Sequence, residues 1–159
     1  AGEFGHTIIE PDGRPCPCGN LGCLEQYASE RAILHQYAAR MNLDRADIDS
    51  FVAACNRQEP TALSLLDEFV RYMAVGINNL LNIFNPDIIV INSSFTIYFP
   101  EVLKRIEGSL RNRMRSYCRL VPSGLQDTSI LLGAACVCIR NFLGVSHLNL
   151  PTKAENAGI

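Results

Sequence analysis

The sequence predicts an α/β fold that is rich in helix and begins with a cysteine-rich loop. Several segments repeat apolar residues at helical spacing, and a continuous β-branched run follows the longest of them. Three cysteines lie close together near the start of the chain. Because one clear strand accompanies several helices, we expect further strands of the sheet to come from sequence upstream of this chain.

The length and composition of the chain fit one globular domain. It has 159 residues, of which 48% are hydrophobic and 19% charged, and this balance argues against extensive disorder. The net charge of −2 gives the chain no overall attraction to nucleic acid. No apolar run reaches the ~18 residues that a membrane span needs, so we expect no membrane partner.

The cysteines and the amino-terminal end bear on the compartment. Seven cysteines, an odd number, are unlike a secreted disulfide framework, so we expect a reducing, cytoplasmic environment. The first residues lack the charged and apolar regions of a secretory signal. The chain begins with Ala1 and not with methionine, so we expect a fragment or a processed product.

The first element is a loop over residues 1–23, rich in glycine, proline and cysteine. It contains a short β-like run, residues 7–10, followed by the turn-forming sequence Pro11-Asp12-Gly13. Because the loop has few apolar residues to pack, we expect it to need another means of stabilisation.

Two helices with N-cap residues follow the loop. The helical pattern starts after Cys23, and Ser29 is placed to cap a helix that runs to about residue 41. Asp47 is placed to cap a shorter helix that runs to about residue 57. The apolar residues of these segments are Leu24, Tyr27, Ala28, Ile33, Leu34, Tyr37, Ala38, Ile48, Phe51, Val52 and Cys55.

The longest predicted helix covers residues 61–84 and leads into the strand. Pro60 precedes it and Asn85-Pro86 ends it, while its apolar residues recur at spacings of three and four. Residues 87–91 form the β-branched run. Such a run is typical of a strand that is buried on both faces of a parallel or mixed sheet.

The carboxy-terminal part predicts two more helices and a weak strand. Apolar residues mark a helix over residues 100–117, a strand over residues 119–122 and a last helix over residues 131–143. Cys136 and Cys138 fall in the last helix, where we expect them in the core, because an unpaired cysteine behaves as a small hydrophobic residue.

The three clustered cysteines predict a metal site. Cys16, Cys18 and Cys23 place three thiolates in one tight loop. Zinc takes four ligands in a tetrahedron and favours thiolate and imidazole groups. His6 is the nearest candidate for the fourth ligand, and the turn after residue 10 allows the chain to fold back. We therefore predict one structural zinc ion at His6, Cys16, Cys18 and Cys23.

Two other interpretations of these cysteines are open, namely free thiols in a loop and a redox pair. The Cys-x-Cys spacing is shorter than the Cys-x-x-Cys of thioredoxin-type motifs. Closely spaced thiols without a metal would also oxidise. Both points favour the zinc site.

The residues around the predicted ligands resemble the signature of the ROK family, which comprises repressors, open reading frames and kinases. The match covers Gly2-Glu3-Phe4-Gly5-His6 and Cys16-Pro17-Cys18-Gly19-Asn20-Leu21-Gly22-Cys23-Leu24-Glu25, and it extends to Ser29. Asn82-Ile83-Phe84-Asn85-Pro86 and Gly133-Ala134-Ala135 resemble the carboxy-terminal lobe of the same family. The resemblance implies a partial actin-like, ribonuclease H-like ATPase-type lobe.

The resemblance also implies roles for individual residues. Glu3 and Glu25 match carboxylates of the family that contact sugar hydroxyls, and His6 can touch the sugar as well. A carboxylate is a good acceptor for two neighbouring hydroxyls, and a zinc ion would hold the loop that presents it. Without the family, Glu3 and Glu25 would be interpreted as surface charges. The family's zinc ligands match His6, Cys16, Cys18 and Cys23.

Two functions are compatible with the resemblance, a repressor and a sugar kinase. The family's nucleotide-phosphate motif and catalytic aspartate lie upstream of Gly2, so we expect no catalytic residue in this chain. Kinases of the family carry glycines after the strand, which let backbone N–H groups approach a nucleotide. This chain has Asn92-Ser93-Ser94-Phe95 there, which favours a NagC-like transcriptional regulator.

The resemblance also implies an organisation and a set of partners. We expect one sugar-sensing lobe over residues 1–150, with a core over residues 24–143, and a disordered tail over residues 151–159. The expected partners are a small sugar or sugar phosphate, DNA through a domain that this chain lacks, and further copies of the chain. A third interpretation is a zinc-stabilised interaction module that has no sugar site.

Overall fold

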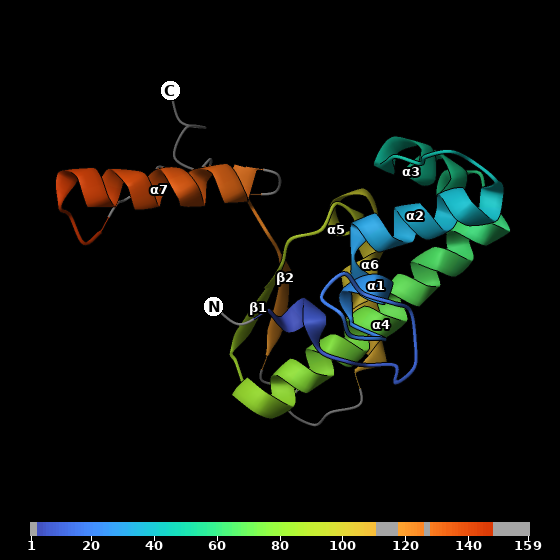
Figure 1. Cartoon of the computed structure of the whole chain (residues 1–159), viewed down its shortest axis with the longest axis horizontal. Coiled ribbons are helices and arrows are strands. Elements are labelled where there is room, and N and C mark those ends of the chain that lie inside the picture. Colours follow the sequence, from blue (N-terminus) through green and yellow to red (C-terminus); the bar gives the residue numbers. More distant parts are fainter. Residues whose placement is uncertain (1–2, 111–117, 126–127, 148–159) are drawn as a thin grey trace. The chain divides into compact units, whose positions relative to one another are not determined.

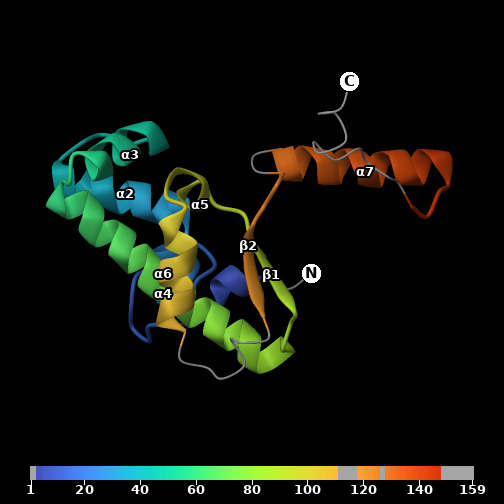
Figure 2. The ribbon, with the colours of Figure 1, turned by 180° about the vertical axis from the view of Figure 1, so that it is seen from behind.

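The computed structural model describes residues 3–110, 118–125 and 128–147. The chain divides into two compact units, Ala1–Ser123 and Gly124–Ile159. Figures 1 and 2 show the ribbon from two opposite sides. The first unit contains, in chain order, the 3-10 helix η1 (Phe4–His6), α1 (Glu25–Ala28), α2 (Glu30–Met41), α3 (Ile48–Asn56), α4 (Pro60–Phe84), β1 (Ile88–Ile91), α5 (Phe95–Tyr98), α6 (Glu101–Ser109) and β2 (Arg119–Pro122), and the second contains α7 (Ser129–Leu143).

Helix α4 forms the centre of the first unit. Helices α1, α2, α3 and α6 all pack against it (Figures 1 and 2). Phe69 and Leu65 of α4 and Phe51 of α3 are fully buried. The ring of Phe69 meets that of Phe95 edge to face, with 4.9 Å between centroids. Full burial of side chains of this size stabilises a fold by about 1.5–3 kcal/mol each.

Both predicted N-caps are confirmed. The Ser29 side chain accepts a hydrogen bond from the Ala32 N–H and begins α2. The Asp47 side chain accepts one from the Ser50 N–H at 2.8 Å, and the Ser50 hydroxyl accepts one from the Asp47 N–H, which completes a capping box. The local caps therefore fix where α2 and α3 start, as the sequence predicted.

Replacing Asp47 by alanine is expected to destabilise the protein in a pH-dependent way. The hydrogen bond from the Ser50 backbone holds the pKa of Asp47 below its usual value. The stabilisation by this cap is therefore complete above the unfolded pKa of about 3.9 and is lost as the pH falls through the lower folded pKa. Melting temperatures of the variant and the wild type should differ at pH 7 and converge in acid. The control is Asp44→Ala, at an exposed position before the cap. Its melting temperature should differ little from that of the wild type at pH 7, so lowering the pH should bring the two no closer.

The strand predicted at residues 87–91 is present as β1, but the prediction that both of its faces are buried is wrong. Strand β1 pairs in parallel with β2, with Ile88 opposite Arg119. Ile91 is only 7% exposed, whereas Ile88 is 45% and Val90 61% exposed. Because side chains alternate along a strand, one face of β1 joins the core and the other faces away from it. The predicted strand over residues 119–122 is confirmed as β2.

The helix predicted over residues 100–117 is shorter than expected. Helix α6 ends at Ser109, and Leu110 has extended backbone, with φ of −71° and ψ of 124°. Gly108 and Ser109 are weak helix formers, and Leu110 is buried at 4% exposure, so the chain leaves the helix to place this side chain in the core. Residues 111–117 of the prediction lie outside the described residues.

Two other expectations need correction. The β-like run over residues 7–10 forms a single bridge, between Ile8 and Cys23, and no strand. The last helix is present as α7. In the second unit taken by itself, Cys138 is exposed and Cys136 only half-buried, so neither is in a core of that unit, whose single described helix has no second element to pack against. The predicted tail, residues 151–159, lies outside the described residues.

None of the described helices is long and apolar enough to span a bilayer.

Candidate metal centre

The structure brings the four predicted metal ligands together. One ligand atom from each of four residues lies within 4.8 Å of all the others, and these residues are His6, Cys16, Cys18 and Cys23. They come from η1 and from the loop that follows it, and the histidine and the first cysteine are ten positions apart in the sequence.

Two of the distances between the ligand atoms match those around a tetrahedral zinc ion, and all of them are within 4.8 Å. Zn–S bonds of about 2.3 Å and a Zn–N bond of about 2.0–2.1 Å place two sulfurs about 3.8 Å apart and a sulfur and a nitrogen about 3.6 Å apart. The Sγ atoms of Cys18 and Cys23 are 3.6 Å apart, and the Sγ of Cys16 is 3.5 Å from Nδ1 of His6. A disulfide would need about 2.05 Å. The donor set and its spacing therefore fit zinc.

Backbone hydrogen bonds fold the loop so that its two ends meet. The Leu24 N–H donates to the Thr7 carbonyl at 2.9 Å and brings the η1 end beside the last cysteine. The Cys16 N–H donates to the Asn20 carbonyl at 3.0 Å, which closes the tight turn between the cysteines. These backbone pairs hold the loop together with the packing of Phe4 and Ile9 against the small apolar cluster of Leu24, Tyr27, Ala28 and Tyr72.

Gly22 occupies a position that no other residue fits. Its φ is +73°, and a Cβ there would lie 1.6 Å from the Glu10 carbonyl oxygen. The Gly22 carbonyl accepts hydrogen bonds from the N–H groups of Ile9 and Glu10 at 2.9 and 3.3 Å, so this close approach is part of the loop's backbone pairing.

Replacing Gly22 by alanine is therefore expected to lower the free energy of unfolding by more than about 2 kcal/mol, because the strain of a positive φ and the overlap of the new Cβ with the Glu10 carbonyl act together. The zinc content should fall with it. Gly19→Ala is the matched control, because Gly19 also has positive φ, at +95°, but has open space around it. Denaturant unfolding of both variants gives the comparison, and equal losses would mean that the close approach at Gly22 is unimportant.

The environments of two thiols differ. Burial raises the pKa of the Cys23 thiol to about 12, so this group is neutral when no cation is bound. A hydrogen bond donated by the backbone of Asn20 to the sulfur lowers the pKa of Cys18. Metal coordination requires thiolates, and the charge of a bound cation would supply the stabilisation that the buried Cys23 lacks.

His6 is oriented by a carboxylate. Its Nδ1 faces the cysteines, while its Nε2 lies 3.3 Å from Oε2 of Glu3, whose side chain is 76% exposed. A carboxylate beside the second ring nitrogen holds the proton on that nitrogen and leaves the first free for a metal. The structure thus places Glu3 beside the predicted histidine ligand.

Glu25 lies on the other side of the same cluster. Its Oε1 accepts hydrogen bonds from the Cys16 thiol at 3.2 Å and from Nε2 of Gln26 at 3.0 Å. The same oxygen is 3.6 Å from a guanidinium nitrogen of Arg31 and 3.9 Å from Nδ1 of His6. The three residues predicted to contact sugar, Glu3, His6 and Glu25, are therefore gathered at one site, and all three are at least partly exposed.

Arg14 is a structural residue that the sequence did not single out. Its guanidinium donates to the Gln26 carbonyl at 2.8 Å, pairs with Glu68 of α4 and lies 4.3 Å from the centroid of the Tyr27 ring. Tyr72 of α4 adds a second link, since its hydroxyl donates to Glu10 at 2.8 Å. These contacts fasten the loop to the central helix. Because their partners lie far away in the sequence, no local pattern reveals them.

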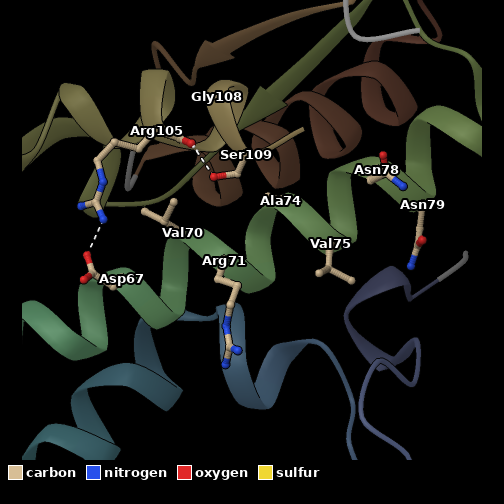
Figure 3. A pocket seen from close by; sticks show the side chains of 10 residues that line it. All are labelled: Asp67, Val70, Arg71, Ala74, Val75, Asn78, Asn79, Arg105, Gly108 and Ser109. Atoms are coloured by element: carbon tan, nitrogen blue, oxygen red, sulfur yellow. Dashed lines mark hydrogen bonds and ion pairs between the residues drawn. The ribbon is translucent and has the colours of Figure 1, made fainter. Parts of the chain in front are cut away.

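The described part of the first unit has several cavities, of which two bear on the site. One of about 320 Å³ adjoins the loop and is lined by Pro15, Pro17, Gln26, Arg31, Ala32, His35 and Gln36. A larger one, of about 750 Å³, lies between α4 and α6 (Figure 3). Arg105 pairs with Asp67 at one end of it, and Asn78 and Asn79 lie at the other. None of its lining residues is a predicted site residue, so its volume alone does not make it the functional site.

The chain is similar in sequence to known proteins. The sequence profile of the ROK family matches residues 1–141. The xylose repressor of Bacillus spizizenii is 32% identical over 91% of this chain and 38% of its own length. The DNA-binding transcriptional dual regulator NagC of Escherichia coli is 32% identical over 92% of this chain and 40% of its own length.

A solved structure shares the fold. It is a ROK family glucokinase from Streptomyces griseus in complex with glucose and AMPPNP, which is 26% identical and aligns with a TM-score of 0.73 over 86% of this chain and 51% of its own. The chain thus spans about two-fifths of the curated relatives and half of this kinase. The family profile covers nearly the whole described chain, and the chain belongs to the ROK family.

Proposed function

We propose that this chain is the carboxy-terminal, sugar-sensing part of a ROK transcriptional repressor of carbohydrate metabolism, stabilised by one structural zinc ion. In this proposal the chain is not catalytic by itself, and DNA is bound by a domain that lies outside it. In this proposal the protein works in the cytoplasm, as its odd number of cysteines indicates, and forms an oligomer, as its family resemblance implies.

The observation that carries the proposal is the arrangement of Glu3, His6 and Glu25 around the cysteine cluster. Two carboxylates lie on either side of one imidazole, 3.3 and 3.9 Å from its nitrogens. Carboxylates that are partly exposed and fixed by neighbours are suited to accept hydrogen bonds from vicinal hydroxyls. A zinc ion at the cluster would fix the loop and the histidine, and so would set the spacing of the acceptors.

Repression is favoured over phosphoryl transfer by the relatives and by the residues after β1. The curated relatives named above are a xylose repressor and the regulator NagC. Asn92-Ser93-Ser94 follows β1 and contains no glycine, and Phe95 comes next with its side chain fully buried. A loop that approaches nucleotide phosphates through its backbone would need smaller residues there.

The second candidate is the carboxy-terminal half of a ROK sugar kinase that phosphorylates a hexose or an N-acetylhexosamine with ATP. The observation in its favour is the alignment with the Streptomyces griseus glucokinase at a TM-score of 0.73. The two candidates share the sugar site and the metal site and differ in the use of ATP.

The test is a calorimetric titration of the full-length protein with xylose, glucose and N-acetylglucosamine, combined with an assay of ATP consumption. A repressor should bind one of these sugars saturably and consume no ATP. Sugar-dependent consumption of ATP would establish the kinase. Zinc binding without heat from any of the sugars would point to an interaction module that has no sugar site.

A further inference from the structure

The cavity of about 320 Å³ beside the metal loop borders the candidate sugar site. Two of the residues that line it, Gln26 and Arg31, also contact Oε1 of Glu25, at 3.0 and 3.6 Å. The cavity and the carboxylate predicted to hold sugar hydroxyls therefore share two side chains. A group attached to a sugar that is bound at Glu25 has this cavity beside it.

The cavity lies where the metal loop meets helix α2. Its lining from the loop is Pro15 and Pro17, which flank the predicted metal ligand Cys16. Its lining from α2 consists of two pairs of residues, each pair four positions apart and so one above the other on the helix. These are Arg31 and His35, and Ala32 and Gln36. Both sides of the cavity are therefore rigid, since one is a helix and the other carries two proline rings.

The polar groups of the cavity have unused hydrogen-bonding capacity. The side chains of His35 and Gln36 have no hydrogen-bond partner among the described residues. Gln26 donates from Nε2 to Glu25 and to Cys16, and its side-chain oxygen accepts no hydrogen bond from the described part of the chain. Amide and imidazole groups together offer donors and acceptors, which is what a ligand rich in hydroxyl groups requires.

The charge of the lining favours a neutral ligand. Arg31 is the one permanently charged residue among the described residues that line the cavity, and its guanidinium is already 3.6 Å from the Glu25 carboxylate. An anionic group placed there would compete with Glu25 for the guanidinium and would be repelled by that carboxylate. Hydroxyl groups meet neither obstacle.

The volume of the cavity suits one further sugar ring. Pockets for small molecules span about 300–1,000 Å³, and this cavity lies at the lower end of that range. We propose that the cavity is a second subsite, which binds the neighbouring ring of a neutral disaccharide whose first ring is held at Glu25. The inference rests on the proposed function and names the class of sugar that the sensor recognises. His35 and Gln36 are its specificity-determining residues.

The test is a calorimetric titration of the full-length protein in which each monosaccharide is compared with its disaccharide. The pairs are xylose with xylobiose, glucose with cellobiose and with maltose, and N-acetylglucosamine with N,N′-diacetylchitobiose. A few added hydrogen bonds between neutral groups should make one of these disaccharides bind about tenfold more tightly than its monosaccharide.

Two kinds of variant locate the second ring. His35→Ala and Gln36→Ala each remove a polar group that makes no hydrogen bond to Glu25 in the described structure. Each should weaken disaccharide binding at least threefold and leave the monosaccharide affinity as it is. Ala32→Leu fills the cavity and should abolish the gain from the second ring, while the backbone N–H that Ser29 caps is kept.

His147→Ala is the matched control for His35→Ala. His147 is also exposed, but it belongs to the second unit and is not among the residues that line the cavity. Its replacement should leave the affinities for monosaccharide and disaccharide at their wild-type values.

Three results would overturn the proposal. Equal or weaker binding of every disaccharide, with monosaccharide binding intact, would remove the second subsite and leave the proposed function standing. A gain from the second ring that persists in all three cavity variants would place that ring elsewhere. Tighter binding of glucose 6-phosphate than of glucose, with the gain lost in the same variants, would make the cavity an anion site. Failure of every sugar to bind would overturn the proposed function together with the subsite.

Discussion

Replacing Cys18 by serine is expected to reduce the zinc content from about one ion per chain to near zero. Cys18 is exposed, whereas Cys16 and Cys23 are buried, so the substitution removes a ligand without opening a cavity in the core. Structural zinc supplies folding free energy directly, and the loop of residues 1–23 has little apolar packing to replace it. The amides of the loop should therefore lose protection against hydrogen exchange. Elemental analysis after dialysis, followed by hydrogen exchange, measures both effects.

The matched control for this substitution is Cys138→Ser. Cys138 is also exposed, but it lies in α7 and outside the cluster. It should retain zinc and wild-type exchange rates. Full zinc occupancy in Cys18→Ser, or equal loss in both variants, would mean that Cys18 is not a zinc ligand.

Replacing Glu25 by glutamine is expected to weaken sugar binding by about ten- to hundredfold, the usual effect of losing a hydrogen bond to a charged group. The substitution keeps the size of the side chain and an acceptor for Gln26, so the α1 turn should stay folded. Zinc should remain bound, because Glu25 is beside the cluster and is not one of its four ligands. Calorimetry with the sugar that the wild-type protein binds, together with a zinc determination, separates the two effects.

Glu101→Gln is the control for this experiment, since it makes the same chemical change at an exposed position in the first turn of α6. Unchanged sugar affinity in Glu25→Gln would remove Glu25 from the sugar site. Loss of zinc in the same variant would instead show that its main role is to support the metal loop.

Much of the helical part of the fold was predictable because its signals are local. Ser29 and Asp47 cap their helices through N–H groups three residues away. Pro60 begins α4 and Asn85, in the left-handed conformation, ends it. The proximity of the four metal-ligand candidates was also predictable, because the whole loop spans few residues and its turn lies between them.

What the sequence did not reveal depends on contacts between distant segments. Arg14 and Glu68 are 54 positions apart, and Glu30 and Ser94 are 64 positions apart. The early end of α6 follows from the burial of Leu110 in a core assembled by other elements. The exposed face of β1 has the same cause, since a continuous apolar run does not show which neighbours cover it.

The most direct measurement is X-ray absorption at the zinc edge on protein purified without added metal. The structure predicts a four-coordinate zinc with three sulfurs at about 2.3 Å and one nitrogen at about 2.0–2.1 Å, from the three cysteines and His6. The spectrum of Cys18→Ser protein that is reloaded with zinc should show two sulfur ligands in place of three. A spectrum with oxygen ligands alone, or a purified protein that contains no zinc and acquires none on addition, would contradict the metal centre and the sugar site that is built on it.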